Sequence, residues 1–323
     1  MTVRADKPLS RSEVARLTQL RSLPNLIKIP LFSGLMVLLT WLAWTTPSGL
    51  ARWASYLGIG YLWMGMVTFM HDATHNTLFR SRPANLVFGI VCMLPLMASF
   101  IAFKEDHLEH HRHNRSPKDP DAFTMGKRGV ADFILFYAYI VGGALLSFIH
   151  FNFIYPVQRF GRKQWTIHLF ETALKVVCYW ALIAWALRHD VLGKTLEVWL
   201  VPVFIFSVFN SIRFLAEHYE TPWNEGQLTG SRATISNPVN RFFWNNINWH
   251  IGHHVYPAVP WYNLEELHEL MRPTIEARGG IVDKSYTSVF LKALLRGPET
   301  EERLLAALEK RRNLEARPEP AAG

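Results

Sequence analysis

The segment ASYLGIGYLWMGMVTFMHDATH, residues 54–75, decides how this chain folds. Its first part, Ala54–Met70, is almost entirely apolar, and it ends in the motif His71-Asp-Ala-Thr-His75. An apolar run of this length predicts a membrane-spanning helix, for which about 17–25 residues suffice. Two histidines four residues apart lie on one face of a helix, so both imidazoles can reach one metal ion at its end.

Other apolar segments have a similar length. They are Ile29–Thr46, Asn85–Phe103, Ala131–Tyr155, Trp165–Leu187 and Leu196–Ala216. The 323 residues are 50% hydrophobic and 19% charged, which excludes a disordered chain and a coiled coil. The two cysteines, Cys92 and Cys178, lie apart in apolar segments, and this excludes cysteine-based zinc, iron–sulfur and redox sites.

Basic flanks orient the first segments. Residues 1–28 are rich in Arg and Lys, show no signal-peptide pattern, and carry a capping box from Ser10 to Glu13 that predicts a short helix. Because cytoplasmic flanks of membrane helices are enriched in positive charge, we expect this arm in the cytosol. Ile29–Thr46 and Ala54–Met70 then form a hairpin that returns to the cytosol at the first histidines.

A second hairpin is expected from Trp165–Leu187 and Leu196–Ala216, which return to the cytosol near His218. Histidine motifs lie on both sides of Asn85–Phe103, so this segment cannot cross the membrane if those motifs share one site. Ala131–Tyr155 likewise connects segments that must begin and end on the cytosolic side. We therefore interpret both segments as interfacial or re-entrant. The alternative is that Ala131–Tyr155 spans and one of the last two segments does not.

The predicted fold is all-α: an integral membrane protein with four transmembrane helices in two hairpins and a helical cytosolic cap that holds a dimetal site. We divide the chain into an N-terminal arm (1–28), a membrane domain (29–298) and a C-terminal helix and tail (299–323). In the cap, a helix is predicted near Leu264–Arg278 with a break at Pro273, and a charged helix near Glu299–Asn313.

Histidine is over-represented, with 14 residues, and two further motifs repeat the pattern of the first. They are His107-Leu-Glu-His110-His111 and His250-Ile-Gly-His253-His254, each with histidines at i, i+3 and i+4 on one helix face. Imidazole suits iron, zinc, copper and nickel. Eight clustered imidazoles are too many for one ion and fit two.

The three motifs resemble the histidine boxes of the membrane-bound fatty acid desaturases and their hydroxylase relatives in type, order and spacing. The flanking sequences Lys118-Asp-Pro-Asp121, Asn248-Trp-His250 and Tyr256-Pro257 are similar too. The resemblance covers His71 to about His268. It implies a non-haem diiron centre, with two Fe²⁺ ions held by histidines, that uses O2 as co-substrate and two electrons.

The resemblance implies ligands at all eight motif positions: His71, His75, His107, His110, His111, His250, His253 and His254. Relatives often supply one more ligand near the end of the last spanning helix, where His218 lies here. The alternative for His218 is an ordinary interfacial histidine. We interpret His113 as lying beside the ligands or at the surface.

Ligating histidines usually donate their other ring N–H to a carboxylate or carbonyl. The carboxylates that flank the motifs are Asp72, Asp106, Glu109, Asp119 and Asp121. Asn210, Arg213 and Glu217 share a helix face, and we expect this stripe to point at the site, with snorkelling to the helix end as the alternative. Glu171 and Lys175, at i and i+4, are expected to form a structural ion pair.

Oxidation of an unactivated C–H bond in a lipid acyl chain is the function that these features favour, most directly fatty acid desaturation. A carotenoid ketolase or hydroxylase and an alkane or fatty acid hydroxylase are the alternatives, because one ligand set serves all of them. A histidine-rich metal transporter is disfavoured, since the histidines lie at helix ends rather than near the bilayer midplane.

The expected electron donor is a separate ferredoxin or cytochrome with its reductase, because the sequence shows neither a dinucleotide-binding GxGxxG motif nor a cysteine cluster. The net charge of +8 is read as cytosolic flanking charge, so no nucleic-acid partner is expected.

Overall fold

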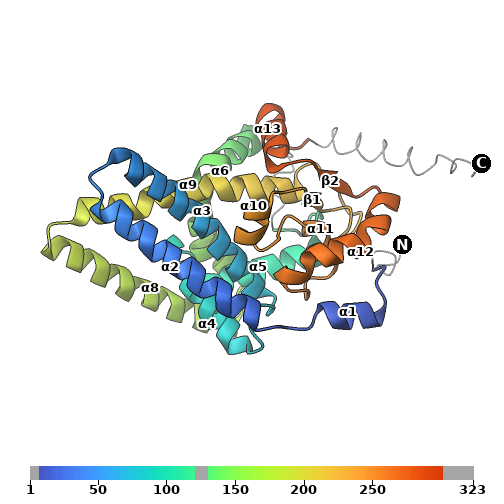
Figure 1. Cartoon of the computed structure of the whole chain (residues 1–323), viewed down its shortest axis with the longest axis horizontal. Helices are drawn as coiled ribbons and strands as arrows, with labels where there is room; N and C mark the ends of the chain where they lie inside the picture. The colour runs from blue at the N-terminus through green and yellow to red at the C-terminus, as the bar shows by residue number, and fades with distance from the viewer. Residues whose placement is uncertain (1–6, 121–129, 301–323) are drawn as a thin grey trace, which may run out of the picture.

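The computed structural model describes residues 7–120 and 130–300, which form a predominantly helical protein (Figure 1). The N-terminal half contains α1 (Arg11–Leu17), α2 (Leu23–Thr45), α3 (Gly49–Thr74), α4 (Arg82–Met93), η2 (Leu94–Leu96) and α5 (Phe100–His113). The middle contains α6 (Val130–Ile149), the π-helical η4 (His150–Ile154), α7 (Tyr155–Arg159), α8 (Arg162–Arg188) and α9 (Leu192–His218). The C-terminal part contains β1 (Arg232–Thr234), α10 (Pro238–Phe243), α11 (His250–Val255), η5 (Trp261–Asn263), α12 (Leu264–Ala277), β2 (Ile281–Asp283) and α13 (Tyr286–Arg296).

Serine side chains begin several of these helices. Ser48, Ser81 and Ser99 are the N-caps of α3, α4 and α5, and each accepts a hydrogen bond from the backbone N–H three residues later. In α1, Ser10 and Glu13 form the predicted capping box. These contacts satisfy backbone donors that a helix start leaves unpaired. The helix predicted in the N-terminal arm is confirmed.

Four described helices are long and apolar enough to cross a membrane: α2, the continuous unit Val130–Arg159, α8 and α9. The number agrees with the sequence prediction, but the membership differs, because Val130–Arg159 replaces α3. Sixteen of the 26 residues of α3 are buried. Since α3 packs against α2 and α9, side chains such as Tyr56 and Trp63 face protein, and a lower hydropathy is sufficient there.

The predicted re-entrant segment is a sharp bend, in which α4 and η2 meet α5 at 107°. The predicted ion pair between Glu171 and Lys175 is wrong, because each side chain binds other partners. Glu171 accepts hydrogen bonds from Ser99 Oγ and from the backbone N–H of Ile101, whereas Lys175 donates to Asn152 Oδ1. Both charges on α8 therefore stabilise the bend and its surroundings.

The bend depends on a glycine in α4. A Cβ at Gly89 would lie 2.3 Å from the ring of Phe100, the first residue of α5, so no larger residue fits without a shift. We expect Gly89→Ala to destabilise the protein by about 1–3 kcal/mol, the usual cost of overpacking. The measurement is the melting temperature in detergent. Gly34→Ala in α2 is the control, because a Cβ there meets nothing within 4 Å; equal melting temperatures for the two variants would contradict this account.

The C-terminal part departs from an all-α fold in one place. Strands β1 and β2 pair in parallel, with Ala233 opposite Val282, and Arg232 donates two hydrogen bonds to the carboxylate of Asp283. The predicted helix near Leu264–Arg278 is confirmed as α12, but the break at Pro273 is wrong, since α12 continues through it. The helix predicted at Glu299–Asn313 lies outside the described residues beyond position 300.

Two connections between long helices lie at the same end of the protein. In Figure 1 the turn between α2 and α3 and the turn between α8 and α9 both lie at the left end, opposite α11, α12 and the strands. The C-terminal ends of α3 and α9 therefore point toward the same region, where they meet α5 and α11. The three histidine motifs lie on α3, α5 and α11, and α9 ends in His218.

Candidate metal centre

Two clusters of ligand atoms form where α3, α5, α9 and α11 meet. Cluster I contains five histidines whose ring nitrogens lie within 4.8 Å of one another: His71, His75, His107, His111 and His253. Cluster II is built from two overlapping triads within the same limit: His110, His218 and His254, and Glu217, His218 and His250. The structure thus brings together all nine histidines that sequence reasoning selected.

In cluster I, several Nε2 atoms lie close to one another. His75 lies 3.0 Å from His107, His107 lies 3.1 Å from His111, and His111 lies 3.1 Å from His253. With a metal–nitrogen distance of about 2.1 Å, two ligands at a right angle are separated by about 3.0 Å. The spacing therefore matches ligands around a common ion.

Cluster II shows which ring nitrogens are free to bind. The Nδ1–H of His218 donates to the carbonyl of Gly230, and that of His110 donates to Asp119 Oδ1, both at 2.9 Å. Because a carbonyl or carboxylate only accepts, the proton is on Nδ1 and the lone pair is on Nε2. Gln227 Oε1 accepts the Nδ1–H of His254 in the same way, at 2.9 Å.

The Nε2 atoms of cluster II also converge. His250 Nε2 lies 3.1 Å from that of His218 and 3.0 Å from that of His254. His250 has one ring proton at most to offer on this side, so it can satisfy only one of these two lone pairs. In cluster I, both ring nitrogens of His71 are buried without a hydrogen-bond partner. A cation in cluster I would bind one of the two His71 nitrogens, and a cation in cluster II would bind the converging lone pairs, so the residues fit a pair of metal ions.

The three histidines of α11 are suited to bind as neutral ligands. Burial lowers the pKa of His250, His253 and His254 well below the usual histidine value, and the neighbouring histidines lower it further. A neutral imidazole is the form that binds a metal. Gly252 lies within this motif, and a Cβ there would press on Leu267 of α12 at 3.1 Å, so glycine permits the close packing that fixes α11.

The spacing within each motif decides which cluster a histidine joins. Pairs at i and i+4 stay together, as His107 with His111 in cluster I and His250 with His254 in cluster II. The third member of each triple crosses to the other cluster, namely His110 and His253. Residues i+3 and i+4 differ by about 100° around a helix axis, which directs neighbouring histidines to two different ions.

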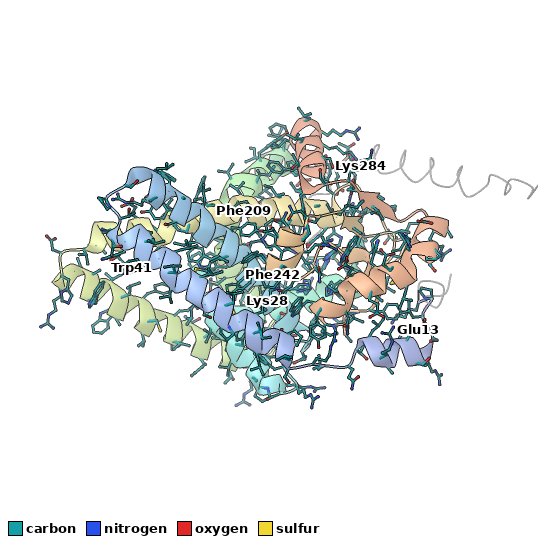
Figure 2. All side chains as sticks on the ribbon, viewed as in Figure 1. Glu13, Lys28, Trp41, Phe209, Phe242 and Lys284 are labelled. Carbon is teal, nitrogen blue, oxygen red and sulfur yellow. The ribbon has the colours of Figure 1, made fainter. Side chains whose placement is uncertain are left out.

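A chain of buried polar side chains runs from Asp72, next to His71 of cluster I, to α2. Asp72 accepts a hydrogen bond from Asn245 Nδ2 at 2.7 Å, and Asn245 Oδ1 accepts one from Lys28 Nζ at 2.6 Å. Lys28 is 1% exposed, and its ammonium lies 4.8 Å from the ring centre of Phe242 (Figure 2). Asp72 Oδ1 is 3.6 Å from His71 Nδ1, which is too long for a hydrogen bond.

The carboxylates predicted beside the motifs have different partners. Asp106 accepts from His150 Nε2 at 3.0 Å rather than from a cluster histidine. Glu109 accepts from the hydroxyl of Tyr155 and pairs with Arg159, away from both clusters. Asp119 alone of this set binds a cluster histidine within hydrogen-bond distance among the described residues. Asp121 lies outside the described residues, and His113 is half-buried and joins neither cluster.

A cavity of about 300 Å³ opens beside the clusters. Its wall includes His71, His107, His110, His218 and His250 together with apolar residues of α3, α5, α6 and α9. The predicted stripe Asn210, Arg213 and Glu217 lies on this wall, with an ion pair between Arg213 and Glu217. Along α9 the wall runs from His218 to Phe206, which is about 18 Å at 1.5 Å per residue.

Sequence reasoning missed the residues that hold the ligands from a distance. Gln227 binds His254 and also donates from Nε2 to the backbone carbonyl of His111, so it connects the second and third motifs. Asn245 and Lys28 join Asp72, and His150 joins Asp106. These residues follow no ligand spacing, and no signal in one sequence marks them.

Comparison with known proteins agrees with this site. A family model described as "Fatty acid desaturase" matches residues 47–286. The sn-1 oleoyl-lipid 12-desaturase of Arthrospira platensis is 26% identical over 224 residues, which cover 62% of this chain and 62% of that protein. Dihydrorhizobitoxine desaturase of Bradyrhizobium elkanii is 25% identical over 276 residues, 78% of this chain and 75% of that protein. Sphingolipid delta(4)-desaturase DES1 of Drosophila melanogaster is 27% identical over 228 residues, 68% of this chain and 65% of that protein.

Proposed function

The chain belongs to the fatty acid desaturase family, and from this premise we propose that it inserts a double bond into a lipid acyl chain with a diiron centre and O2. Family membership makes it an oxidoreductase rather than a metal transporter. The observation that carries the proposal is the convergence of nine histidines into two clusters, with members of both clusters on the wall of one cavity. We assign one iron ion to cluster I and one to cluster II.

The proposed membrane arrangement follows from the direction of the helices. The ends of α3 and α9 meet at the metal centre, so α2 with α3 and α8 with α9 form two hairpins that start and finish on that side. The unit Val130–Arg159 joins α5 to α8, and both of these ends lie on the same side. We therefore propose that it lies along the interface rather than crossing, although it meets the length and hydropathy of a spanning helix.

On this arrangement the arm (1–28) and the cap over the clusters face the cytosol, following the basic residues near the start of α2. We propose residues 29–298 as the membrane desaturase domain. The apolar outer surface of α2 fits this placement, since Trp41 is 58% exposed and points away from the helical bundle (Figure 2).

The bound iron pair, with O2 and two electrons, supplies an oxidant strong enough to remove hydrogen from an unactivated C–H bond, which no acid or base side chain can do. Overall, the substrate gives up two protons and two electrons, the donor gives two electrons, solvent supplies two further protons, and O2 becomes two water molecules. We propose that the donor is a ferredoxin or a cytochrome with its own reductase.

The chain's own residues supply geometry and environment. Asp119, Gly230 and Gln227 hold the Nδ1 protons of three ligands, which keeps the Nε2 lone pairs directed into cluster II. The apolar wall of the cavity binds a methylene chain and excludes water from the clusters. Glu217 lies 3.6 Å from His250 Nδ1, and its ion pair with Arg213 fixes the carboxylate at the inner end of the cavity.

Lipid profiling by mass spectrometry tests the proposal. A host expressing this chain with a ferredoxin and its reductase is expected to gain an acyl double bond that is absent with His253→Ala, because His253 belongs to cluster I. A new hydroxyl group instead of a double bond would make the enzyme a hydroxylase. Unchanged acyl chains, in cells where the protein binds iron and consumes O2, would contradict an acyl substrate.

A further inference from the structure

Glu299 follows α13 and is completely buried, although it lies outside residues 47–286, which the family model matches. Its carboxylate accepts two hydrogen bonds from Arg115, from Nη1 at 3.0 Å and from Nη2 at 2.9 Å. Arg115 is 3% exposed, and its guanidinium lies 4.4 Å from the ring centre of Trp223. A bidentate pair of this kind fixes both position and orientation.

Arg115 lies in the turn that follows α5 and carries a left-handed backbone, with φ of 55°. In this conformation its N–H donates to Asp119 Oδ2 at 2.7 Å, while Asp119 Oδ1 accepts the Nδ1–H of His110 at 2.9 Å. A non-glycine residue adopts such a backbone only when its surroundings hold it there. The contact with Glu299 therefore supports the carboxylate that orients His110.

Glu299 also binds the turn after α9. Its Oε1 accepts a hydrogen bond from the backbone N–H of Glu220, two residues after His218. The backbone carbonyl of Thr221 in the same turn accepts from Arg115 Nη2 at 2.8 Å. One carboxylate thus joins the ends of the two helices that supply His110 and His218 to cluster II.

We propose that Glu299 is a positioning residue for cluster II, which it completes by holding the end of α5 against the end of α9 through Arg115. No contact of Glu299 or Arg115 reaches a histidine of cluster I among the hydrogen bonds of the described residues. Replacement of Glu299 is therefore expected to weaken iron binding at cluster II and to leave iron binding at cluster I unchanged. The inference rests on the proposed two-ion function.

The test measures iron bound to the purified full-length protein in detergent, by elemental analysis and by competition with a chelator under anaerobic conditions. The wild type is expected to hold two ions per chain. Glu299→Gln is expected to keep one ion and to bind the second at least roughly tenfold more weakly, as for other residues that orient a metal ligand. Glu220→Gln is the matched control, because its side chain pairs with Lys292 and Arg296 and not with Arg115.

The outcomes separate the inference from the proposed function. A wild type that binds fewer than two ions overturns the proposed function. Two ions bound by Glu299→Gln with wild-type affinity overturn only the role of Glu299. If Glu299→Gln does not fold, Arg115→Lys replaces it, because this variant keeps the buried charge but loses the bidentate contact. Unchanged binding in Arg115→Lys, or loss of fold in both variants, also overturns the inference.

Discussion

His218→Ala is expected to lower product formation at least about a hundredfold, because loss of a ligand should exceed the effect usual for residues that only orient one. His218 is the one cluster histidine outside the three motifs, and its Nε2 lies 3.1 Å from that of His250. Its Nδ1–H donates a hydrogen bond to the carbonyl of Gly230, so the lone pair that can bind a metal is on Nε2. Iron content is expected to fall from two ions to one per chain.

The matched control is His113→Ala. His113 is also a histidine beside the second motif, but it is half-buried and belongs to neither cluster. This variant is expected to keep both ions and its product yield. A His218→Ala protein that retains two ions and forms product at the wild-type rate would show that His218 is an interfacial histidine. Equal losses in both variants would show that the assay responds to general instability.

The site could be predicted from the sequence because its ligands follow helical spacing. A histidine pair such as His71 and His75 lies on one face of a helix, and this local rule is visible without a structure. The split of each triple between two clusters was not predicted, although the 100° rotation between His110 and His111 implies it. The spacing predicts one shared face, whereas the structure places adjacent histidines in different clusters.

The contacts that hold the ligands could not be predicted, because they come from distant segments. Lys28 reaches Asp72 through Asn245, a residue 217 positions along the chain from Lys28. Lysine in a spanning segment is usually placed at a membrane surface, and only the packed aromatic rings around it reveal a buried role. Asp72 lies inside the first motif and yet is 3.6 Å from His71, whereas Asp119 makes a direct hydrogen bond to His110.

The membrane segments show the same limit. Hydropathy measures what a helix exposes to lipid, so it identifies α2 and α8 and does not select α3, whose core-facing side holds small and polar-tipped residues. It also accepts Val130–Arg159, for which we propose a place along the membrane interface. Tertiary packing, rather than composition, decides which of these two helices connects the clusters to the membrane interior.

Ala144→Phe is expected to reduce product from long acyl chains roughly tenfold or more while iron binding is retained. Ala144 lies on the cavity wall formed by α6, and its backbone N–H donates to Ser207 of α9 at 2.6 Å, so a larger side chain must extend into the space between these helices. A pocket that has lost volume discriminates against substrates that fill it. Cluster ligands lie on other helices, and the ions should therefore remain bound.

Ala138→Phe makes the same substitution at an exposed position of α6, two turns earlier, and is expected to leave the product unchanged. Product analysis with acyl chains of decreasing length adds a second criterion. If the cavity is the acyl site, Ala144→Phe should lose its longest substrates first and recover activity on shorter ones, because only part of the path along α9 is blocked. A uniform loss at every chain length would instead indicate damage to the fold. An unchanged product profile with iron bound would show that the acyl chain reaches the clusters by another route.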